Sequence, residues 1–207
     1  MEATMTLIRR MSLTCEHACF QAGLGIGLII VLSLPVGRAL LESSLINHML
    51  VQIPLLALAG WMIGKSMFAS LFLESNRNGI PGLLIALFVM LFWMLPRWLD
   101  AALSEPLWEA IKFITIPLLI GLPLGISWPR MSSFSRAVVW TNSISMLVIL
   151  GWLYVAAPLR VCNNYLVNQQ EDFGYMAMAL AVVIAAYWVG IAFFGKWDKP
   201  ESSDVIR

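Results

Sequence analysis

Three side chains in this sequence have the chemistry to bind a soft metal ion together, namely His48, Met49 and Met94. Imidazole binds copper, zinc and iron, and thioether sulfur favours Cu(I). His48 is the histidine that falls within a long apolar run, and a polar group inside a bilayer is a functional hypothesis by default. One interpretation makes His48 the primary copper ligand, with Met49 or Met94 as soft partners. The other makes it an interfacial histidine hydrogen-bonded to a neighbouring loop or helix, with the methionines as packing residues.

Further polar side chains are candidates for the same face of the protein: Arg38, Gln52, Asp100, Glu109, Lys112 and Cys162. Glu109 and Lys112 are three residues apart, so they can pair on one face of a helix, and Arg97 and Asp100 have the same spacing. Two interpretations stay open. These residues form a ring of interfacial ion pairs that fixes the outer loops, or they line a polar funnel for an ion or a partner protein.

The three cysteines leave several hypotheses open. Cys162 is predicted to lie in an outer loop, in an oxidising compartment. There it could be a free thiol, a metal ligand, half of an intermolecular disulfide or an inert buried thiol. Cys15, His17 and Cys19 form the run CEHAC, which could clip a soft metal. On a helix, however, the two cysteines share a face that His17 does not, which favours two ordinary thiols.

The composition indicates an integral membrane protein. Of the 207 residues, 60% are hydrophobic and 12% are charged, whereas an average soluble domain is about 25% charged. The net charge of +1 argues against nucleic acid as a partner. The sequence has no phosphate-binding glycine loop and no haem-attachment motif, so we expect a protein without catalytic activity.

Hydropathy and length predict one all-α domain over residues 1–207, a polytopic membrane helix bundle with six transmembrane helices. The expected helices are approximately residues 20–41, 45–64, 80–96, 107–128, 137–158 and 173–195. The central stretch, 45–64, carries no formal charge and spans about 30 Å as a helix, the thickness of one hydrocarbon core. Nine of the 13 Lys and Arg residues fall on the side of the two termini. The positive-inside rule therefore predicts that both termini are cytoplasmic and that the His48 side faces outward.

Two local motifs resemble a known family. Residues 47–56 read NHMLVQIPLL, and the run Trp93-Met94-Leu95-Pro96 is followed by Asp100-Ala101-Ala102-Leu103 and by a helix that ends at Trp128. This order resembles the CtaG-type cytochrome c oxidase assembly factors, over residues 45–128. The resemblance implies a multi-pass protein of the bacterial inner membrane that is linked to copper delivery and contacts a respiratory oxidase.

The sequence departs from that family in its ligands. Gln52 stands where a second histidine is common, and Met94 stands at the histidine of the family's Trp-His-x-Pro motif. Lys112 lies in a region where further histidines cluster. Met94 suits Cu(I), but Gln52 and Lys112 are poor replacements.

The leading hypothesis is therefore an assembly or accessory factor for a respiratory copper enzyme, without catalysis, in which copper is the one possible cofactor. The alternative is a structural subunit of a membrane complex that binds no metal. A haem or quinone carrier is disfavoured by the scarcity of axial ligands. A transporter is disfavoured because the spans lack charges near their middles and paired broken helices.

Overall fold

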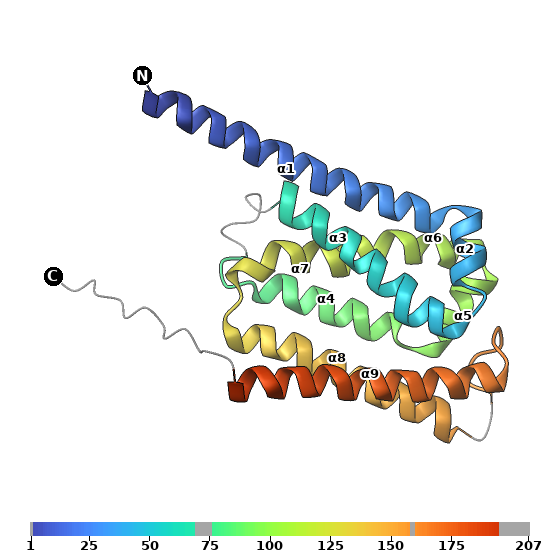
Figure 1. Ribbon diagram of the computed structural model, residues 1–207. Helices are drawn as coiled ribbons and strands as arrows, with labels where there is room; N and C mark the ends of the chain where they lie inside the picture. Colours follow the sequence, from blue (N-terminus) through green and yellow to red (C-terminus); the bar gives the residue numbers. More distant parts are fainter. Residues whose placement is uncertain (1, 69–75, 158–159, 195–207) are drawn as a thin grey trace.

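The computed structural model describes residues 2–68, 76–157 and 160–194, with the side chains of the first helix described from His17 onward. Every regular element in these ranges is helical, which confirms the all-α prediction. Figure 1 shows antiparallel helices whose first residues, in α1, and last residues, in α9, lie at the same end of the bundle. The elements are α1 (Glu2–Ser33), α2 (Pro35–Leu41), η1 (Asn47–Gln52), α3 (Ile53–Met67), α4 (Ile80–Trp93), α5 (Pro96–Ser104), α6 (Pro106–Thr115), η2 (Ile116–Gly121), α7 (Leu122–Ser127), η3 (Trp128–Arg130), α8 (Ser133–Ala156) and α9 (Val167–Phe194).

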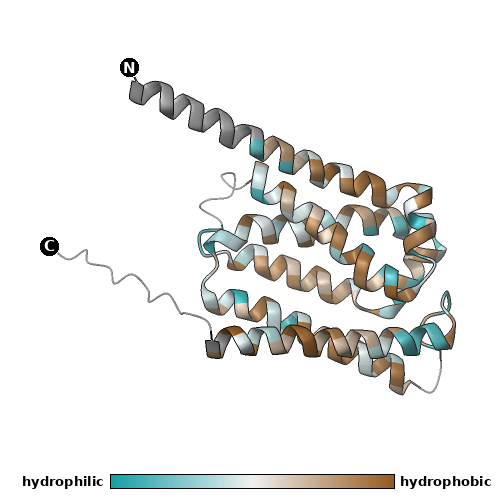
Figure 2. Ribbon diagram, viewed as in Figure 1, coloured by the Kyte–Doolittle hydropathy of each residue, from teal (hydrophilic) through white to brown (hydrophobic). Residues whose placement is uncertain are grey.

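The helices are long and apolar enough for a membrane protein. Four continuous stretches within the described residues could cross a bilayer, and the number rises to six if each of two bent helix pairs is one span. The six expected spans correspond to these six stretches. Figure 2 shows hydrophobic residues along most of the helices, with hydrophilic residues gathered toward the ends of the bundle. The cytoplasmic position of the termini remains a prediction, as does the single-domain assignment.

Two of the expected helices are broken at a proline. The helix expected over 20–41 bends by 73° between α1 and α2, at Leu34 and Pro35. The helix expected over 80–96 ends at Trp93, and α5 leaves it at 71°. Proline disfavours helical backbone in the residue before it, and both preceding residues are extended. Residues 97–106, expected to be a connector, are therefore largely helix α5.

The starts of the first and last helices also differ from the prediction. Residues 1–19, expected to be a tail, continue α1 as helix from Glu2. The last helix begins at Val167 and not near residue 173, so the connector before it is shorter than expected.

Two prolines inside the spans coincide with π-helical turns. In η1 the N–H of Ile53 bonds the carbonyl of His48, five residues back, and Pro54 follows directly. In η2 the N–H of Leu122 likewise bonds the carbonyl of Pro117, five residues back. A proline removes an N–H and crowds the carbonyl four residues before it, so the helix widens locally and continues. The wide turn η1 carries His48 and Gln52.

Small residues set the central packing. Helix α3 packs between α1 and the continuous stretch formed by η2 and α7. A Cβ at Gly60 would meet the backbone of Pro117, and one at Gly121 would meet the backbone of Ala57. The backbones therefore touch, as in membrane helices with small residues at the interface. On α1 the contact runs through Gly25, beside Ala59, while Gly23 has no neighbour within 4 Å among the described residues.

Candidate functional site

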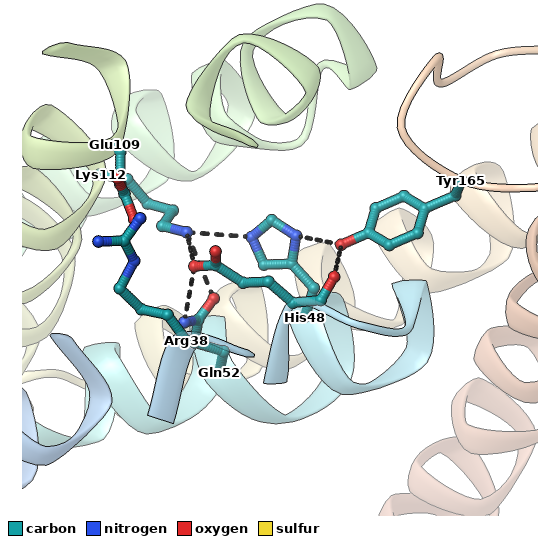
Figure 3. Close-up of polar contacts among 7 residues, drawn as sticks. Arg38, His48, Gln52, Glu109, Lys112 and Tyr165 are labelled. Carbon is teal, nitrogen blue, oxygen red and sulfur yellow. Dashed lines mark hydrogen bonds and ion pairs between the residues drawn. The ribbon is translucent and has the colours of Figure 1, made fainter. Parts of the chain in front are cut away.

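The buried polar cluster of this protein surrounds Lys112. The side chains of Lys112, His48 and Gln52 have no solvent-exposed surface. Lys112 Nζ donates to Glu42 Oε1 at 2.7 Å, to Gln52 Oε1 at 3.3 Å and to His48 Nε2 at 3.4 Å. An ammonium has three N–H donors, so each has an acceptor. We call Lys112, Glu42, His48, Gln52 and Tyr165 the Lys112 centre (Figure 3).

Tyr165 closes the hydrogen bonds of the centre into a ring. Its hydroxyl lies 3.0 Å from His48 Nδ1 and donates to the backbone carbonyl of Glu42 at 3.0 Å. Because a phenol has one hydrogen, the hydroxyl must accept from Nδ1–H, and Nε2 is then the acceptor that faces Lys112. The path runs from the Glu42 carboxylate through Lys112, His48 and Tyr165 to the Glu42 carbonyl. The side-chain nitrogen Nε2 of Gln52 also donates to the Glu42 carboxylate, at 3.0 Å from Oε1.

The elements explain why these side chains meet. His48 and Gln52 lie on η1, Lys112 lies in the last turn of α6, and Glu42 is the C-cap of the short helix α2. All three elements lie at the end of the bundle opposite the first residues of α1, where the chain between α8 and α9 also passes (Figure 1). Three of the predicted outer residues, His48, Gln52 and Lys112, lie together at this end of the bundle.

The charged pairs differ from the expected ones. Glu109 pairs with Arg38 of α2, and Lys112 pairs with Glu42. The ion pairs therefore join α6 to α2 and do not join Glu109 to Lys112 within α6. Arg38 and Glu42 are one turn apart on α2, and Glu109 and Lys112 are one turn apart on α6. Two helices with complementary charges therefore face each other, and each charge takes a partner on the other helix.

Asp100 fixes the chain between α8 and α9. Its carboxylate accepts from the backbone N–H of Asn163 at 3.0 Å and of Asn164 at 3.1 Å. It also accepts from both asparagine amides, at 2.9 Å and 2.7 Å. Arg97, expected as its partner, lies over the ring of Trp98 instead. Asp100 holds the segment that carries Tyr165 and therefore positions the centre from a distance.

Cys162 is a free, buried thiol in the same segment. Its sulfur lies 3.0 Å from the hydroxyl of Tyr154. Burial raises the pKa of the Cys162 thiol, which disfavours the reactive thiolate. Burial also raises the pKa of the Tyr165 phenol, with the nearby Glu42 carboxylate acting in the same direction. Of the four hypotheses for Cys162, the inert buried thiol describes this environment.

The three predicted copper ligands have different neighbours in the structure. Met49 packs into the hydrophobic core and Met94 packs against that core at the end of α4. Both ring nitrogens of His48 already have partners, and a cation at Nε2 would meet the Lys112 ammonium 3.4 Å from that nitrogen. The arrangement as it stands fits a copper ion poorly, and copper binding stays a prediction.

The second metal hypothesis rests on the run Cys15-Glu-His17-Ala-Cys19. His17 and Cys19 are exposed on α1, while the side chain of Cys15 lies outside the described residues. Among the residues that the structure describes, no three His, Cys, Asp or Glu side chains form a group that could hold a metal ion.

The candidate site residues predicted from the sequence did not include two members of the centre, Glu42 and Tyr165. Glu42 was recognisable as an acidic residue one turn after Arg38, at the end of an apolar run. Tyr165 had no local signal, because its partner His48 lies 117 positions away.

The fold and the centre define the class of this protein as an all-α membrane protein with a buried polar centre at one end. No protein-family model, no curated protein and no solved structure matches the chain.

Proposed function

We propose that this chain is a non-catalytic membrane accessory protein whose polar centre is completed by the Lys112 ammonium in place of a metal ion. The observation that carries the proposal is the position of Lys112 Nζ among a carboxylate oxygen, an imidazole nitrogen and an amide oxygen. These are donor atoms that also bind metals. A cation tethered to α6 satisfies them without any ligand from outside.

The resemblance to CtaG-type assembly factors supports the same proposal. His48, Gln52 and Lys112 come from the two segments in which that family has histidines, and here they contact one another. In this proposal the chain keeps the scaffold of an assembly factor for a respiratory copper enzyme of the bacterial inner membrane. Its role is to contact a membrane partner rather than to deliver copper.

Metal content tests the proposal directly. The protein is purified under reducing conditions with copper supplied, and elemental analysis and a visible spectrum are recorded for the wild type, Lys112→Ala and Lys112→Ala/His48→Ala. We expect no bound metal in the wild type. We expect metal uptake in Lys112→Ala, because three donors then surround a vacated position, and loss of that uptake in the double variant. Lys65→Ala, which removes a lysine that contacts the ring of Trp61, is the matched control.

The partner is tested in the same preparation. A stoichiometric membrane protein that stays bound in mild detergent, with the wild type free of metal, would support the accessory role. A chain that purifies alone from its native membrane, without a partner at any detergent strength, would contradict it.

Copper handling is the second candidate, because Met49 follows His48 in η1 and both side chains are buried. Near-stoichiometric copper in the wild type that disappears in His48→Ala would establish this candidate and overturn the first. It would also require that Lys112 moves away from His48 when copper binds.

A further inference from the structure

We infer that α2 and the turn after it, residues 35–44, form a lid that controls access to the Lys112 centre from the outer end of the bundle. We call this segment the lid. Four observations carry the inference: the way the lid is attached, the backbone turns at both of its ends, the open space on both of its sides, and the complete burial of the side chains behind it. The inference concerns access to the centre and does not depend on whether a metal binds there.

The lid is attached through polar contacts. None of the seven residues of α2 is buried, and Val36 and Leu40 are 71% and 66% exposed. The attachments are the ion pair from Arg38 to Glu109, the contacts of the Glu42 carboxylate and the hydrogen bond from Tyr165 to the Glu42 carbonyl. Leu41, at the end of α2, also packs partly buried against the hydrophobic core. Because the other attachments are polar, breaking a few contacts lowers the free energy needed to release the segment.

The backbone on each side of α2 departs from a continuous helix. Leu34 is extended before Pro35, where the chain turns by 73°. Residues 42–44 form a turn before the helix resumes at Leu45. Hinges are a few element-terminal residues of this kind, which absorb a change in backbone angles.

The lid has free space on both flanks. On one side a cleft of about 510 Å³ lies between α2 and the segment that carries Asn164 and Tyr165. On the other side a smaller cleft of about 310 Å³ lies between α2 and α6. Arg38 lines both clefts, so its side chain separates them.

Behind the lid the centre is closed. His48, Gln52 and Lys112 have no exposed surface, and Glu42 of the lid contacts both Gln52 and Lys112. Opening the lid would remove Glu42 from Lys112 and would expose the imidazole of His48 to the aqueous side. The ion pair between Arg38 and Glu109 then acts as a latch, because it joins the lid to α6 without being part of the centre.

Chemical modification of His48 tests the lid. Diethyl pyrocarbonate modifies the imidazole of accessible histidines, and in a His17→Gln background His48 is the sole histidine. The rate of modification at His48 is followed by mass spectrometry at constant pH in the full chain. We expect slow modification in this parent and a rate roughly tenfold higher in Arg38→Gln, which corresponds to about 1.4 kcal/mol in the opening equilibrium.

Two further variants keep the test decisive. Arg38→Gln leaves Glu109 unpaired, so Arg38→Gln/Glu109→Gln removes the latch without an orphaned charge and should accelerate modification to a similar extent. Arg97→Gln removes an exposed arginine at the same end of the bundle and should leave the rate unchanged. Equal rates in the parent and the double latch variant would overturn the lid. Acceleration in Arg97→Gln as well, or a parent rate equal to that of free histidine, would also overturn it.

Discussion

Replacing Glu42 with glutamine removes the carboxylate that lies 2.7 Å from the buried Lys112 ammonium. The glutamine keeps an oxygen that accepts a hydrogen bond, so the change isolates the charge. The partner change is Lys112→Met, which keeps the length of the side chain and removes the cation. The double variant Glu42→Gln/Lys112→Met carries neither charge and completes a double-mutant cycle.

The expected magnitudes follow from burial. Removing one member of a buried ion pair costs about 3–5 kcal/mol, because the other charge is left uncompensated. Lys112 is fully buried, but the Glu42 side chain is 14% exposed, so water reaches the pair from one side. We therefore expect each single change to cost about 3 kcal/mol, near the lower end of that range. We expect the double variant to cost no more than either single change, since a neutral pair needs no compensation.

Unfolding in mixed detergent micelles provides the assay. Tryptophan fluorescence is the readout, and Trp93 contributes to it from a buried position where its indole N–H donates to Thr115 Oγ1 at 2.9 Å, across α4 and α6. Glu105→Gln, at an exposed carboxylate of the same end, is the control and should change stability by less than about 0.5 kcal/mol.

Two results would refute the reasoning. Single changes that cost below about 1 kcal/mol would show that the pair behaves like an exposed surface pair. A double variant whose cost equals the sum of the single costs would show that the two charges do not interact.

Three further outcomes follow from the same geometry. Gly60→Ala should destabilise the fold by about 1–3 kcal/mol or more in the unfolding assay, because its Cβ would meet the backbone of η2, while Gly23→Ala, with no neighbour within 4 Å among the described residues, should be tolerated. The folded state binds more protons than the unfolded state above pH 9, because burial raises the pKa of Cys162 and Tyr165 from ordinary values of 9.0 and 10.0. Stability should thus be complete below pH 9 and fall as the pH rises further, and melting curves of Tyr165→Phe should show a weaker fall. Asp100→Ala should speed proteolysis between α8 and α9, measured by the cleavage rate in micelles, and an unchanged rate would show that the asparagine contacts do not hold that segment.

The helices could be predicted from sequence because apolar runs of about 20 residues have few alternatives in a bilayer. Antiparallel spans of similar length also bring alternate connectors to the same side, which is why the outer polar residues were expected together. The prolines were visible, but their effects depend on context. Pro35 ends a helix where the chain leaves the bundle, whereas Pro54 sits in a packed span and yields a π-turn.

The partners within the centre could not be predicted from spacing. Their spacing on a helix predicts that Glu109 pairs with Lys112. In the structure Glu109 pairs with Arg38, and Lys112 pairs with Glu42, which lies 70 positions away in the sequence. The competing contacts exist only because α2 folds back over the end of the bundle. The same holds for Tyr165, whose hydroxyl meets His48 through a segment that Asp100 positions.

The members of the hydrogen-bond ring are synthesised at different times, in the order of the chain. Glu42 and His48 are synthesised with the first two spans, Lys112 follows with the fourth span, and Tyr165 follows after α8 has been made. Until residue 165 emerges, Nδ1 of His48 and the carbonyl of Glu42 lack their partner hydroxyl. Unpaired polar groups at membrane depth are costly, so a chain that ends before Tyr165 leaves these two groups of the centre unsatisfied. The hydrogen bonds of the Lys112 centre are therefore complete only after the connector between α8 and α9 has been synthesised.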